Sequence, residues 1–111
     1  MNKNSIIQFK NLNDEQKDLL TVNVIKGLVM DGVGNAKSGH PGGPMSLADF
    51  TFILYSEFLT IDPKNPDWEN RDRVVLSVGH TCMLIYSILY LSGYLKIEDL
   101  KSFRKLDSLT P

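Results

Sequence analysis

The stretch Arg71–His80, RDRVVLSVGH, decides the fold that the sequence predicts, because it changes from strand character to helix within a few residues. Val74–Leu76 is a short apolar run typical of a strand. The residues Gly79 and His80 follow directly. Met83–Leu91 is then almost entirely apolar, which favours a buried helix because of its length and the glycine that follows it. A strand that enters a helix through a glycine indicates an α/β protein.

A long helix is expected well before this unit. Asn13 and Gln16 have the spacing of a capping box, which predicts that a helix begins there. Gly32 and Gly34 predict its end. Its expected apolar stripe consists of Leu20, Val24, Ile25, Leu28, Val29 and Val33.

Two more helices are expected, so the fold class is α/β with mostly helical content. The glycines and prolines between Gly34 and Ser46 predict a loop, since neither a helix nor a strand tolerates so many breakers. Ser46 and Asp49 have capping-box spacing and predict a helix that continues to Phe58. The last expected helix spans about Ile97–Leu106. The helix expected from Ser46 to Phe58 has an apolar face of Leu47, Phe50, Ile53, Leu54 and Phe58.

The composition allows one small domain, and its nearly balanced charges produce no strong electrostatic field. The chain has 111 residues, 42% of them hydrophobic, and a formal net charge of −1. Such a balance favours neither nucleic acid nor a membrane surface as a partner. Met1–Lys10 lacks the apolar core of a signal peptide, and the single cysteine, Cys82, fits a reducing compartment, so a cytoplasmic location is expected.

The first candidate site residue is His40, in the loop SGHPGGPM (Ser38–Met45). Its neighbours fix or free the backbone without covering the imidazole, so the ring is expected to be exposed. Histidine is the natural proton-transfer residue near neutral pH. A solvated turn histidine between two helices is an equally good interpretation on spacing alone.

The second candidate is His80, at the expected start of a helix. Backbone N–H groups there carry partial positive charge, and an imidazole can add a hydrogen bond to a phosphate oxygen. A capping or core histidine is the simpler alternative. Arg71 and Arg73 bracket Asp72, a pattern more typical of a surface ion pair than of a phosphate site. The two histidines show no metal-ligand spacing.

Together, the passages SGHPGGPM and DPKNPDWENRDRVVLSVGH closely resemble the amino-terminal region of transketolases. The similarity continues through MLIYSILYLSGY and LKSFRKLDSLTP, and covers Asn35–Pro111. It implies that residues 1–111 are part of the diphosphate-binding domain of a doubly wound, thiamine-diphosphate enzyme. Such an enzyme moves a two-carbon ketol unit from a ketose phosphate to an aldose phosphate. It implies a homodimer that needs Mg²⁺ and serves the pentose phosphate pathway.

The resemblance also implies roles for single residues. His40 would contact the sugar and assist proton transfer, with Ser38 close to a substrate hydroxyl or phosphate. His80 would contact the cofactor diphosphate, and Gly79, like Gly39 and Gly42, would let the backbone approach closely. Val78 stands where the family commonly has asparagine, and Thr81 and Cys82 stand where small residues are usual. These departures bear on the hydrogen bonds around His80.

The resemblance places other parts of the site outside this chain. The family's Gly-Asp-Gly passage and later asparagine, which hold the metal, and its activating glutamate do not occur here. The chain also ends at Pro111 without a closing element, so we expect a truncated domain that is inactive alone. Two alternatives remain: an enzyme similar to deoxyxylulose-phosphate synthase, and a non-catalytic module that completes a site with a partner chain.

Overall fold

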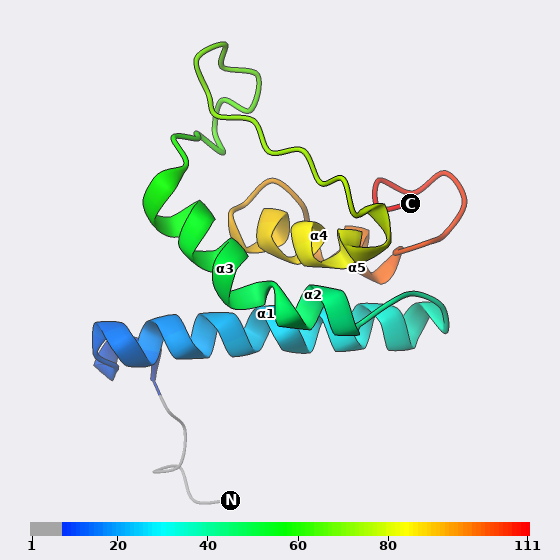
Figure 1. The fold of residues 1–111 in the computed structure, drawn as a ribbon, viewed down its shortest axis with the longest axis horizontal. Helices are drawn as coiled ribbons and strands as arrows, with labels where there is room; N and C mark the ends of the chain where they lie inside the picture. Colours follow the sequence, from blue (N-terminus) through cyan, green and yellow to red (C-terminus); the bar gives the residue numbers. More distant parts are fainter. Residues whose placement is uncertain (1–7) are drawn as a thin grey trace, which may run out of the picture.

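The computed structural model describes residues 8–111, which form a long helix with shorter helices packed along one side (Figure 1). Residues 1–7 lie outside the described part of the chain. They include most of Met1–Lys10, the segment expected not to be a signal peptide. The elements are η2 (Phe9–Asn11), α1 (Asp14–Ala36), α2 (Gly42–Ser46), α3 (Ala48–Ile53), the π-helical turn η3 (Leu54–Phe58), η4 (Gly79–Thr81), α4 (Cys82–Leu91) and α5 (Ile97–Lys101). No helix among the described residues is long and apolar enough to cross a membrane.

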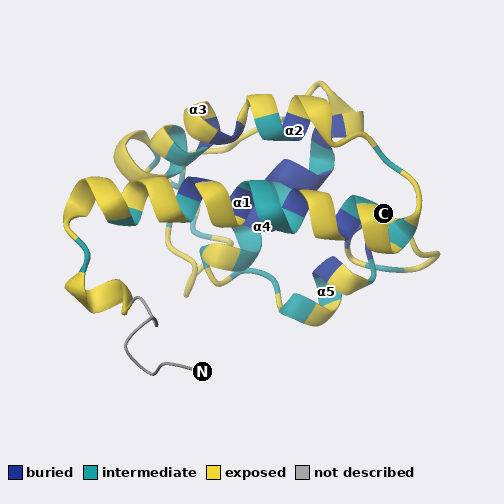
Figure 2. Cartoon of the chain, turned by 90° about the horizontal axis from the view of Figure 1, so that it is seen from below, coloured by how far each residue is buried: buried dark blue, intermediate teal, exposed yellow. Residues whose placement is uncertain are grey.

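Helix α1 begins where the capping box predicts. The Asn13 side-chain oxygen accepts a hydrogen bond from the Gln16 backbone N–H at 2.8 Å, and the Gln16 side chain accepts one from the Asn13 N–H at 3.0 Å. Four of the six residues of the expected apolar stripe are buried or pack against the core, whereas Leu20 and Val24 are each 39% exposed. The buried face instead consists of Val22, Ile25, Val29 and Gly32 (Figure 2). The buried face of α1 differs from the expected stripe because it turns toward α4, which packs against α1.

Gly32 and Gly34 do not end α1, which continues to Ala36 and stops at Lys37 in the left-handed conformation (φ 53°). Gly32 serves helix packing instead. A Cβ atom at this position would lie 2.5 Å from Met83 Cε, and Met83 is itself buried in α4. The glycine therefore lets α1 and α4 approach closely.

Gly32→Val should destabilise the protein by about 1–3 kcal/mol, because the added atoms would displace the buried Met83 side chain from its present position. Gly27→Val is the matched control on the same helix, since a Cβ atom at Gly27 meets nothing within 4 Å. This control should change stability by less than about 0.5 kcal/mol. Thermal unfolding of both variants tests the expectation, and equal midpoints would contradict it.

The loop expected between Gly34 and Ser46 contains a short helix, α2, which is a correction to the sequence interpretation. Pro44 is tolerated because it lies in the first turn, where N–H groups have no partner inside the helix. The expected cap at Ser46 is also absent: Ser46 ends α2, and no side-chain hydrogen bond caps α3. Leu47 joins the two helices, its N–H donating to Gly43 and its carbonyl accepting from Thr51.

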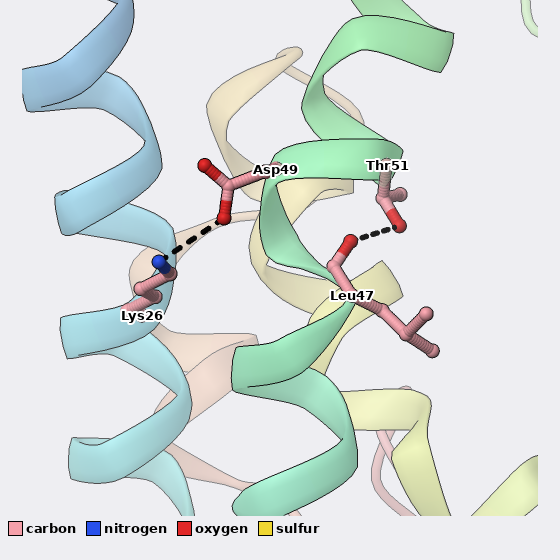
Figure 3. Close-up of polar contacts among 4 residues, drawn as sticks. All are labelled: Lys26, Leu47, Asp49 and Thr51. Atoms are coloured by element: carbon pink, nitrogen blue, oxygen red, sulfur yellow. Dashed lines mark hydrogen bonds and ion pairs between the residues drawn. The ribbon is translucent and has the colours of Figure 1, made fainter.

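The joint between α2 and α3 is stabilised by Thr51, whose hydroxyl donates to the Leu47 carbonyl at 2.9 Å (Figure 3). Lys26 of α1 forms an ion pair with Asp49 of α3 at 3.1 Å (Figure 3). Both charged groups are partly exposed, so the pair contributes little. The expected apolar face of this helix is mostly exposed, with Phe50 at 66% and Phe58 at 70%, while Ala48 and Thr51 face the core.

No β-strand occurs within residues 8–111, so the strand expected at Val74–Leu76 is not formed there. The segment is irregular, and Val75 is 88% exposed. A strand needs a neighbour to satisfy its backbone groups, and the described chain supplies none. The mostly helical content is confirmed, whereas a doubly wound sheet is not seen.

The expected ion pair around Asp72 is also wrong. The Asp72 carboxylate accepts a hydrogen bond from the Thr60 N–H at 2.7 Å. The Arg71 guanidinium donates to the Trp68 carbonyl at 2.7 Å, and that of Arg73 donates to the Arg71 carbonyl at 3.0 Å. These side chains therefore hold the connecting loop together.

The buried helix expected at Met83–Leu91 is confirmed as α4, with Met83, Leu84, Ser87 and Ile88 buried. The last helix is shorter than expected, because α5 ends at Lys101. Arg104 and Asp107 both adopt the left-handed conformation, which reverses the chain after α5. Leu106 is consequently 92% exposed.

Candidate functional site

The structure brings His40 and His80 together, although they are 40 positions apart in the sequence. Their ring centroids lie 4.9 Å apart, and the rings meet edge to face at an interplanar angle of 67°. His40 lies in the loop between α1 and α2, and His80 lies in η4 immediately before α4. Both residues are exposed, so a ligand can reach these side chains.

The end of α1 determines where His40 lies. Lys37 and Ser38 donate backbone hydrogen bonds to Gly34 and Val33, which closes the helix. Gly39 then has φ 132°, a conformation that a side chain would strain, and a Cβ atom there would lie 3.3 Å from Phe103 Cε1. Gly39 therefore directs the chain sharply into His40.

A second close approach brings the two histidine-bearing segments together. A Cβ atom at Gly43 would lie 2.8 Å from the Thr81 methyl carbon, so glycine lets α2 pack directly against η4. Thr81 is fully buried and its hydroxyl donates to the Val78 carbonyl at 2.8 Å. This contact holds His80 beside the loop that carries His40.

The two imidazoles line a pocket of about 180 Å³. Its other lining residues are Gly79, Cys82, Phe103, Arg104 and Pro111. The ring of buried Phe103 meets that of Tyr86 edge to face at 6.0 Å. We call this hollow the histidine pocket.

Tyr86 supports one edge of the histidine pocket. Its hydroxyl donates a hydrogen bond to the Pro111 carbonyl at 3.2 Å. Burial raises the pKa of the Tyr86 phenol above its ordinary value, and the nearby Cys82 thiol raises it further. The phenol therefore stays protonated at neutral pH and remains a donor.

Only some of the residues expected in the site line the histidine pocket. His40, His80 and Gly79 share the histidine pocket, whereas Ser38 is exposed and is not among its lining residues. A Cβ atom at Gly79 or Gly42 would meet nothing within 4 Å, so no part of the described chain fills the space beside them.

Sequence reasoning missed several lining residues. Cys82 was not expected in the site, although its place two residues after His80 is a usable signal. Phe103, Arg104 and Pro111 carried no local signal, because a long chain reversal brings them to the pocket.

The donor set of the histidine pocket fits an anion such as a diphosphate. Two histidines and one arginine are among its lining residues, and no Asp or Glu side chain is among those found within the described chain. The start of α4, immediately after η4, adds the positive end of a helix dipole. Within residues 8–111, no group of three His, Cys, Asp or Glu side chains is arranged to hold a metal ion.

Comparison with known proteins gives consistent results. The family model described as "Transketolase, thiamine diphosphate binding domain" matches residues 17–111. Transketolase 1 of Aliivibrio fischeri is 58% identical over 90 residues, which are 80% of this chain and 14% of that protein. The chain thus spans about 14% of the length of the curated relatives it matches.

Solved structures agree with these sequence matches. Transketolase from Campylobacter jejuni superposes with a TM-score of 0.83 and 50% identity, over 90% of this chain and 16% of that one. A Pichia stipitis transketolase in complex with sedoheptulose-7-phosphate gives 0.81 and 47%, over 85% and 14%. By its sequence and its fold, this chain belongs to the thiamine-diphosphate-binding domain family of the transketolases.

Proposed function

We propose that the protein containing this chain is a transketolase, which transfers a two-carbon ketol unit from a ketose phosphate to an aldose phosphate. The observation that carries the proposal is the pairing of His40 and His80 at one anion-compatible pocket beside a helix start. Family membership and the sugar phosphate in the Pichia stipitis structure support the reaction class.

We assign His80 and Gly79 to the cofactor. When bound, thiamine diphosphate would supply the carbon nucleophile for the ketose carbonyl. The His80 imidazole donates a hydrogen bond to a diphosphate oxygen. The open space beside Gly79 lets that diphosphate approach the backbone at the helix start.

We assign His40 to the sugar. An exposed imidazole beside the cofactor can donate a hydrogen bond to a substrate oxygen and move a proton as the carbon–carbon bond breaks. We also assign Ser38 to the sugar. Ser38 follows the end of α1 and lies outside the histidine pocket, so it contacts only a substrate that extends beyond that pocket.

Further properties follow from the same proposal. We expect Mg²⁺ to accompany the diphosphate, held by groups outside this chain, because a doubly charged diphosphate needs a counter-charge. We also expect a homodimer, a cytoplasmic location and a role in the pentose phosphate pathway.

We propose that residues 74–76 become a strand of a doubly wound sheet when the rest of the domain is present. Three observations support this: the apolar composition, the irregular unpaired backbone, and the exposure of Val75. An experimental structure of the full-length protein in which these residues lack sheet hydrogen bonds would contradict it.

A coupled assay of ketol transfer tests the proposed function. The full-length protein should convert a ketose phosphate and an aldose phosphate only when thiamine diphosphate and Mg²⁺ are added. The 111-residue chain should show no turnover and no tight cofactor binding, because exposed imidazoles and a helix start contribute only about 1 kcal/mol each. Absence of turnover by the full-length protein would contradict the proposal, and turnover by the chain alone would contradict the second expectation.

A further inference from the structure

We propose that Arg104 is an anion-binding residue of the histidine pocket, where its guanidinium holds a phosphoryl group of a bound molecule. The inference rests on the proposed function, which brings phosphate-bearing molecules to this pocket. Both the cofactor diphosphate and the sugar phosphate offer the same chemistry, and the experiment below separates them.

The three arginines of the chain differ in what their side chains do. Arg71 donates to the Trp68 carbonyl at 2.7 Å, and Arg73 donates to two carbonyls of the same loop at 3.0 and 3.2 Å. Arg104 instead lines the histidine pocket. Within residues 8–111, no hydrogen bond or ion pair engages its guanidinium, so its donors are available to a ligand.

The backbone of Arg104 is held in a conformation that arginine does not favour. Its φ is 61°, in the left-handed region that glycine or asparagine adopts at lower cost. The Arg104 N–H donates to the Thr110 carbonyl at 2.9 Å. Thr110 is fully buried, and its hydroxyl donates to the Asp99 carbonyl at 2.6 Å. Arg104 is therefore anchored at the pocket, and the backbone requirement alone does not account for an arginine there.

The pocket suits a guanidinium–phosphate contact. Arginine presents planar N–H donors that pair with two phosphate oxygens at once. The imidazoles of His40 and His80 add further donors on the same hollow. Because no Asp or Glu side chain is among the lining residues found in the described chain, the charge of the lining side chains favours an anion.

Arg104→Gln in the full-length protein tests the inference, with cofactor affinity and the KM for the sugar phosphate measured separately. We expect at least one of them to worsen about tenfold or more. A raised Kd for thiamine diphosphate assigns the contact to the diphosphate. A raised KM with an unchanged cofactor Kd assigns it to the sugar phosphate, and no change in either overturns the proposal.

Two controls separate the guanidinium from other effects. Lys105→Gln removes the same charge from the adjacent exposed residue, which does not line the pocket, and should leave both constants within about twofold. Arg104→Gly relieves the left-handed backbone while removing the side chain, so it should lose as much affinity as Arg104→Gln. If Arg104→Gly binds like the parent protein, Arg104 is only a backbone element and the proposal fails.

Pyrophosphate titration keeps this inference separate from the proposed function. If the parent protein shows no ketol transfer, calorimetric binding of pyrophosphate to the parent and to Arg104→Gln still tests the anion site. Weaker pyrophosphate binding by Arg104→Gln supports the site, and equal binding overturns it.

Discussion

His40→Ala in the full-length protein should lower kcat about 100-fold or more while leaving the Kd for thiamine diphosphate nearly unchanged. The loss is expected because a positioned general acid–base group contributes about 10²–10⁴ to a rate. The cofactor should be retained because the diphosphate contacts are assigned to His80 and Gly79 rather than to His40. Steady-state kinetics beside calorimetric titration of the cofactor would measure both quantities.

His40→Gln is the informative companion variant. Glutamine keeps a hydrogen-bond donor but cannot exchange a proton near neutral pH, so it should restore KM more than kcat. His40 is exposed, and neither variant should lower the unfolding midpoint by much. A large loss of cofactor affinity together with an unchanged kcat at saturation would refute the assignment.

His80→Ala should have the opposite effect and raise the Kd for thiamine diphosphate about 10- to 150-fold. That range corresponds to the loss of one hydrogen bond to a charged group, about 1.5–3 kcal/mol. Saturating cofactor should restore much of kcat, because the residue that handles the sugar remains. The measurement is a calorimetric or fluorescence titration with Mg²⁺ held constant.

Cys82→Ala serves as the control for His80→Ala. Cys82 lines the same histidine pocket but offers only a weak donor, so its removal should change the cofactor Kd by less than about threefold. If His80→Ala binds the cofactor as well as the parent protein does, His80 has a structural role in the edge-to-face contact with His40.

Local patterns predicted the helices whose signals involve near neighbours. The capping box of Asn13 and Gln16 forms as expected, because both partners lie within one helical turn. The apolar run from Met83 to Leu91 becomes α4 for a similar reason, since its burial needs only some apolar neighbour. The family motifs around His40 and His80 likewise predicted two of the residues that now line one pocket.

Patterns failed where the outcome depends on a distant partner. Gly32 has the sequence appearance of a helix end, yet its role is set by Met83, some fifty positions away. Val74–Leu76 has strand composition, yet no neighbouring strand exists within residues 8–111 to pair with it. Ser46 has the spacing of a cap, yet it is the last residue of α2, and no side-chain hydrogen bond caps α3.

The sequence by itself therefore determined the start of α1, the buried helix α4, the family and the two histidines, because these depend on residue types at short spacing. Only the tertiary structure decided that the centroids of the two imidazole rings lie 4.9 Å apart. The close approach of Gly43 to Thr81 brings them together. The tertiary structure likewise decided that Arg104 reaches the histidine pocket, through the Arg104–Thr110 hydrogen bond and the burial of Thr110. The physical reason is that close packing and chain reversal join residues far apart in sequence, and local spacing carries no record of such contacts.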